Sequence, residues 1–212
     1  MNKLLLHPAA KPVVFALCML PFAWLFYLAL SDGLGANPQE ALIRATGDWT
    51  LRFICIVLAV TPLRVLAQLS ALARLRRMLG LFVYFYVVVH LLSYSWFDME
   101  FDVGDIVKDI IKRPFILVGF LAFLLLTPLA ATSFNAAIKA MGAKRWQLLH
   151  KLVYLIACLG LLHFFWMRAG KNDFAEVFVY AGIVAVLLGW RLQQFLVKRR
   201  RPAAPMPVGR VH

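Results

Sequence analysis

Residues 78–97, MLGLFVYFYVVVHLLSYSWF, are the most informative segment for the fold class. It contains no Asp, Glu, Lys or Arg, and its length is what a helix needs to cross about 30 Å of hydrocarbon. His90 lies well inside this stretch, between valines and leucines. The sequence therefore predicts a transmembrane helix that carries a buried imidazole.

Five further apolar stretches of similar length flank it. A chain that is 63% hydrophobic and only 16% charged cannot keep its surface in water, which excludes a soluble enzyme. Membrane-spanning segments must satisfy their own backbone hydrogen bonds, so we expect an all-α, polytopic bundle in one domain, residues 1–196. The predicted spans are residues 13–30, 49–67, 78–97, 115–131, 148–167 and 174–196, and residues 197–212 are a basic cytoplasmic tail.

The formal net charge of +13 is distributed unevenly along the chain. With a cytoplasmic N-terminus, 16 of the 23 Lys and Arg residues fall in inside segments, whereas all ten acids fall outside. Cytoplasmic segments of membrane proteins carry excess Lys and Arg. We therefore predict six spans with both termini inside, in contact with membrane lipid and with no nucleic-acid partner.

Two histidines are expected at the same depth. The third and fifth spans both run from inside to outside, and His90 lies about 12 residues into the third while His163 lies about 15 into the fifth. Two imidazoles at one level are the axial ligands that the iron of a b-type haem takes. His90 and His163 are thus predicted to bind haem iron.

His150 opens the fifth span, about 20 Å before His163 at 1.5 Å per residue. Thirteen residues of ideal helix would point the two side chains about 220° apart, so a bend or π-bulge would be needed to align them. The position in the third span that would pair with His150 is Arg76. Either His150 has an unusual or exogenous partner in a second haem site, or it serves a quinone or flavin.

Four arginines are candidate contacts for haem propionates, a flavin phosphate or a quinone. Arg64, Arg76 and Arg77 gather at the inner ends of the second and third spans, and Arg52 lies at the outer end of the second. Guanidinium groups pair well with carboxylates and phosphates. A positive-inside cluster also accounts for the three inner arginines.

Several short motifs run through nearly the whole chain. They are TGDWTLR at 46–52, TPLR at 61–64, RRMLGL at 76–81, KRPFILVG at 112–119, TPLAATS at 127–133 and WQLLHKLVY at 146–154. With His90 and His163, these motifs resemble the MsrQ (YedZ) family within the ferric-reductase-like transmembrane domain superfamily.

The resemblance implies a haem b subunit of the bacterial inner membrane, with one haem or two and with FMN. It implies that electrons pass from the quinone pool to a periplasmic molybdopterin methionine sulfoxide reductase, MsrP, which repairs oxidised periplasmic proteins. His90, His150 and His163 match the family's haem-associated histidines. Methionine sulfoxide reduction itself would occur in the partner.

Two other functions remain open from the residues alone. A small transporter or proton-relay protein could use His90 and His163, although the spans hold no acidic residue placed to pair with them and show no inverted repeat. A scaffold protein could use the same histidines only for packing.

Overall fold

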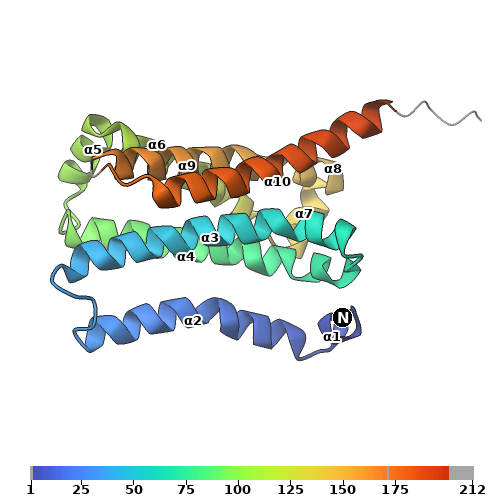
Figure 1. The fold of residues 1–212 in the computed structure, drawn as a ribbon, viewed down its shortest axis with the longest axis horizontal. Coiled ribbons are helices and arrows are strands. Elements are labelled where there is room, and N and C mark those ends of the chain that lie inside the picture. The colour runs from blue at the N-terminus through green and yellow to red at the C-terminus, as the bar shows by residue number, and fades with distance from the viewer. Residues whose placement is uncertain (1, 171, 201–212) are drawn as a thin grey trace, which may run out of the picture.

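The computed structural model describes residues 2–170 and 172–200, and within them every regular element is a helix. The long helices lie side by side along the long axis of the molecule (Figure 1). In chain order the elements are α1 (Asn2–Leu6), α2 (Ala10–Leu30), α3 (Pro38–Leu66), η1 (Ser70–Arg74), α4 (Arg76–Phe97), α5 (Val103–Lys112), α6 (Pro114–Ala131), α7 (Asn135–Met141), α8 (Ala143–Leu149), α9 (Leu152–Ala169) and α10 (Ala175–Arg200).

Six segments of the described chain are long and apolar enough to cross a membrane, which confirms the predicted number of spans. They are α2, α3, α4, α6, the combined segment Ala143–Ala169 that holds α8 and α9, and α10 up to Arg199. Large side chains on α2, including Leu17, Leu20 and Phe26, are more than half exposed. In a spanning helix such a surface faces lipid rather than water.

The two ends of the bundle differ in their short elements. The helices α1, α7 and α8 lie at the end where α10 finishes, and α5 lies at the opposite end (Figure 1). The segments with the predicted inside charges therefore share one end, and the acid-rich connections share the other. An even number of spans places the start of α1 and the end of α10 on the same side.

Three boundaries differ from the prediction. The second span begins at Pro38 rather than residue 49, because the Asn37 side chain caps the helix by accepting a hydrogen bond from the Glu40 N–H at 3.2 Å. The fifth span is interrupted between Leu149 and Leu152. The last helix runs to Arg200, and residues 201–212 of the predicted tail lie outside the described residues.

A further difference is α5, which the hydropathy pattern did not predict because ten residues are too few for a span. The Asp102 side chain caps it by accepting a hydrogen bond from the Asp105 N–H at 2.9 Å. Only Arg113 separates α5 from α6, so the third connection is helical over half its length and leads directly into the next span.

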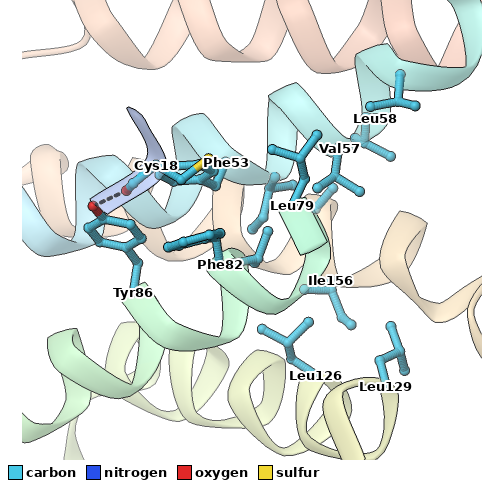
Figure 2. Packing of buried hydrophobic residues seen from close by; sticks show 14 of the residues in the cluster. Cys18, Phe53, Val57, Leu58, Leu79, Phe82, Tyr86, Leu126, Leu129 and Ile156 are labelled. Atoms are coloured by element: carbon cyan, nitrogen blue, oxygen red, sulfur yellow. Dashed lines mark hydrogen bonds between the residues drawn. The ribbon is translucent and has the colours of Figure 1, made fainter. Parts of the chain in front are cut away.

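The core lies where α3 and α4 pack together and meet α6 and α9. Phe53, Phe82 and Tyr86 stack in its centre, while Leu126 and Ile156 extend it toward α6 and α9 (Figure 2). Tyr86 is fully buried, and its hydroxyl donates to the Cys18 carbonyl at 2.8 Å and accepts from the Phe22 N–H at 3.1 Å. This contact joins α2 to α4 next to Pro21, which lies inside α2.

Candidate functional site

A cavity of about 310 Å³ lies among α3, α4, α6 and α9, toward the end of the bundle that carries α5. Its walls are mainly apolar, with Ile54, Val87, Phe123 and Leu126 among the lining side chains. The two histidines His90 and His163 also line it. Apolar walls with a few polar groups are typical of a site that encloses a cofactor.

The structure brings His90 of α4 and His163 of α9 together. Their ring centroids are 6.2 Å apart, and the rings are inclined at 74°. Both side chains are half-buried in the bundle interior. Two helices that run in the same direction therefore present one imidazole each at a common depth.

Each of these imidazoles is oriented by a backbone carbonyl of a neighbouring helix. His90 Nδ1 lies 2.9 Å from the Ile43 oxygen of α3, and His163 Nδ1 lies 2.7 Å from the Phe115 oxygen of α6. Because a carbonyl oxygen can only accept, Nδ1 must be the protonated nitrogen in both rings. Each Nε2 is then left with a lone pair that can bind a metal.

The spacing of the two rings fits a metal ion between them. A transition metal binds an imidazole nitrogen at about 2 Å, so two such bonds on opposite sides of the metal span about 4 Å. The distances from the two ring centroids to their nitrogens account for the rest of the 6.2 Å separation. The described residues contain no group of three or more His, Cys, Asp or Glu that could hold a metal. Haem iron, which is already bound by the porphyrin nitrogens, needs only two side-chain ligands of this kind.

The mouth of the cavity lies at the end of the bundle that carries α5 and is polar, and it holds two ion pairs that were not predicted from the sequence. Arg44 pairs with Glu40 at 2.5 Å within α3, and Arg113 pairs with Asp109 at 2.8 Å. Both pairs have the four-residue spacing of adjacent side chains on a helix, which is the signal that could have found them. Arg44 and Arg113 both line the cavity.

Two further groups complete the mouth. The Tyr94 hydroxyl donates to Asp109 at 2.7 Å, which buries this carboxylate between a phenol and a guanidinium. Asp98 lines the opening from the end of α4. Partial burial raises the pKa of the Asp98 carboxyl, and the nearby Arg113 guanidinium opposes that shift.

None of the four predicted arginines lines this cavity. Arg52 instead donates to the Tyr180 hydroxyl at 3.1 Å and lies over the Trp49 ring. Arg77 donates to Asn135 at 2.6 Å, and the Arg64 and Arg76 side chains are exposed. Arg64, Arg76 and Arg77 lie at the other end of the bundle, and of these three Arg76 interacts electrostatically with His150.

His150 occupies the interruption between α8 and α9 and is far from the other two histidines in the fold. The structure places the irregularity at His150 itself, and not at Gly160 between the two histidines. Its Nδ1 lies 3.0 Å from the Trp146 oxygen, and its ring stacks on the Trp146 indole at 3.8 Å. Its Nε2 is buried and makes no well-aligned hydrogen bond among the described residues, although the Leu129 backbone lies close to the ring, and Arg76 lies within electrostatic range.

Comparison with known proteins places these features in context. Residues 46–161 match the family described as ferric reductase like transmembrane component. A protein of Polaromonas naphthalenivorans, named protein-methionine-sulfoxide reductase heme-binding subunit MsrQ, is 80% identical over 94% of this chain and 91% of its own length.

More distant relatives carry the same name. The protein of Herminiimonas arsenicoxydans is 56% identical over 84% of this chain and 82% of its own length. That of Rhodospirillum rubrum is 46% identical over 91% of both chains. No solved structure matches the chain.

Proposed function

Because the chain belongs to the MsrQ family of ferric-reductase-like transmembrane proteins, we propose that it is a haem-binding electron-transfer subunit of a methionine sulfoxide reductase system. The observation that carries this proposal is the His90 and His163 pair, with centroids 6.2 Å apart at one cavity. Both Nδ1 atoms are bound to carbonyls, so both Nε2 atoms are free to hold haem iron. The relatives' name, which specifies haem binding, agrees with this site.

The residues of the chain have separate tasks in this function. A bound haem b supplies one-electron exchange at its iron. His90 and His163 hold the iron, the Ile43 and Phe115 carbonyls fix the two rings, and the apolar walls exclude water. A low-dielectric surrounding and oriented imidazoles are two of the means by which a protein sets a haem potential.

We infer that electrons come from the quinone pool and leave toward a periplasmic molybdopterin reductase, MsrP, for the repair of oxidised periplasmic proteins. In the proposed orientation both termini are cytoplasmic, and the protein is a multi-pass component of the bacterial inner membrane. The His90 and His163 cavity then opens on the acid-rich periplasmic end. A redox centre near that surface is close enough to exchange an electron with a docked partner.

A second cofactor position is proposed at His150. The His150 Nε2 makes no well-aligned hydrogen bond among the described residues, and a bound ligand would satisfy it. The cytoplasmic arginines Arg64, Arg76 and Arg77 could meet the anionic groups of that ligand. A second haem with a non-histidine ligand, an FMN or a quinone would each use this arrangement.

The visible spectrum of the purified protein tests the proposal. We expect a Soret band and reducible α and β bands, with about one haem lost in His90→Ala and in His163→Ala. His150→Ala should keep the haem of the cavity, since His150 is not one of its lining residues. A well-folded protein without a Soret band, produced with ample haem, would refute the function and favour a proton-relay or scaffold role.

A proton-relay protein makes a different prediction in the same experiment. The wild-type protein would then show no haem spectrum, and His90→Ala would abolish proton flux in vesicles. Haem and flavin content per chain, measured with and without His150, would further separate a second haem from an FMN.

A further inference from the structure

Two glycines lie directly beneath the two histidine rings of the cavity. A Cβ atom built on Gly119 of α6 would lie 2.8 Å from His163 Nδ1 and 3.0 Å from Cε1. One built on Gly47 of α3 would lie 3.1 Å from His90 Cε1 and 3.3 Å from Nδ1. Real Cβ atoms essentially never approach to under 3.0 Å, so the ring at Gly119 would have to move.

The same local arrangement occurs at both glycines. The carbonyl that binds His90 belongs to Ile43, four residues before Gly47, and the carbonyl that binds His163 belongs to Phe115, four residues before Gly119. In an α-helix the carbonyl of residue i faces the N–H of residue i+4. The side chain at i+4 therefore stands beside that carbonyl and restricts access to its second lone pair.

A glycine at i+4 removes this obstacle. The carbonyl oxygen has two lone pairs, one for the helix and one that stays available to an outside donor. The imidazole can then approach the helix closely enough to donate from Nδ1 at 2.7 Å and 2.9 Å. The same arrangement, a glycine four residues after the accepting carbonyl, therefore occurs on α3 for His90 and on α6 for His163.

We propose that Gly47 and Gly119 are positioning residues that set the tautomer and orientation of the two haem ligands. The inference rests on the proposed haem-binding function and extends it to residues that do not touch the iron. A Cβ atom at either position would push the imidazole away from its carbonyl and change the direction in which Nε2 points. An imidazole whose Nδ1–H makes a weaker hydrogen bond also donates less electron density from Nε2 to ferric iron.

Among the described glycines, only these two would place a Cβ atom against an imidazole. Gly160 of α9 lines the same cavity, yet a Cβ there would meet only Ile54 Cδ1 at 3.8 Å, an ordinary van der Waals contact. At Gly80, Gly182 and Gly189 nothing lies within 4 Å. Gly182→Ala is therefore the control, because it adds the same methyl group to a helix, α10, at a glycine outside the cavity lining and away from either imidazole.

The first test compares the haem of three alanine variants in detergent. For Gly119→Ala and Gly47→Ala we expect about ten- to a hundred-fold weaker haem retention, the usual cost of losing a partner that orients a metal ligand. Haem that remains should lose part of its low-spin electron paramagnetic resonance signal and show a more positive midpoint potential. Gly119→Ala should be the more severe variant, and Gly182→Ala should match the wild type.

The second test separates positioning from folding. In a His163→Ala background the ring is absent, so adding Gly119→Ala should leave the unfolding temperature unchanged or raise it, because Ala favours helix over Gly. In the wild-type background the same substitution should lower it. This non-additivity measures the coupling between Gly119 and His163, including the stabilisation by any haem that His163 holds.

The outcomes distinguish this inference from the proposed function. A wild-type protein without haem would overturn both. Wild-type haem with an unchanged signal and potential in Gly119→Ala would overturn the positioning role alone. An equal loss of unfolding temperature in both backgrounds would also overturn it, because the cost would then arise in the helix and not at the ring.

Discussion

Asp109 is the residue on which the mouth of the cavity depends. Its side chain is 10% exposed, accepts a hydrogen bond from the Tyr94 hydroxyl and forms an ion pair with Arg113. Hydrogen bonds to a charged group contribute about 1.5–3 kcal/mol each when both partners are held in place. We therefore expect Asp109→Ala to lower the free energy of unfolding by about 2 kcal/mol, measured by thermal or denaturant unfolding in detergent.

Asp105 on the same helix is the control for this prediction. Its side chain is 61% exposed, and its partner Lys108 is 69% exposed. Exposed ion pairs contribute little, so Asp105→Ala should change stability by no more than about 0.5 kcal/mol. Equal losses in the two variants would show that Asp109 acts through the charge of α5 rather than through its buried contacts.

At the scale of elements, α2 depends on a single side chain of α4. The Tyr86 hydroxyl bridges the Cys18 carbonyl and the Phe22 N–H, the two groups that an uninterrupted helix would join directly. Pro21 lies between them and has no N–H of its own. Tyr86 thus satisfies backbone groups next to the proline and holds the helix against the core.

Tyr86→Phe should keep the packed ring and remove the bridge. We expect a loss of about 1–3 kcal/mol, because a buried carbonyl and N–H lose a partner. The free energy of unfolding in detergent measures it. Tyr84→Phe is the comparison, since Tyr84 stacks on Phe123 and its hydroxyl makes no hydrogen bond within the described part of the chain. A loss in Tyr84→Phe as large as in Tyr86→Phe would refute the bridge.

At the scale of the whole molecule, the sorted charges predict the orientation in the membrane. We expect alkaline phosphatase to be active when fused within residues 31–37, and inactive when fused after Arg200. A green fluorescent protein fused after Arg200 should fluoresce, because the basic end stays in the cytoplasm. Active phosphatase at the C-terminal fusion would reverse the orientation and place the His90 and His163 cavity on the cytoplasmic side.

Adding positive charge offers an independent check of the same orientation. Lysines introduced into residues 31–37 should reduce phosphatase activity of a fusion there, since they compete with the basic cytoplasmic end. Neutral serines at the same positions should have no effect. If lysine and serine variants behave alike, charge does not set the orientation.

Much of the fold was predictable because the membrane restricts it. A span needs about 20 apolar residues and must be helical, so hydropathy alone predicts six helices. The meeting of His90 and His163 was also predictable, because two helices that cross in the same direction can be compared by counting. Hydropathy does not predict helices too short to cross the membrane, such as α5, α7 and α8. It also does not predict the cap that begins α3 at Pro38.

The helical class, the number of spans and the depth of the two central histidines could thus be predicted from the amino-acid sequence. How each helix is rotated about its axis, and therefore which residues meet, became known from the packed structure. It turned Arg52 toward Tyr180 rather than the cavity, and brought Arg44 and Arg113 to its mouth. It also placed Gly47 and Gly119 beneath the rings. The physical reason is that depth follows from the membrane thickness, whereas rotation follows from close packing between helices far apart in the chain.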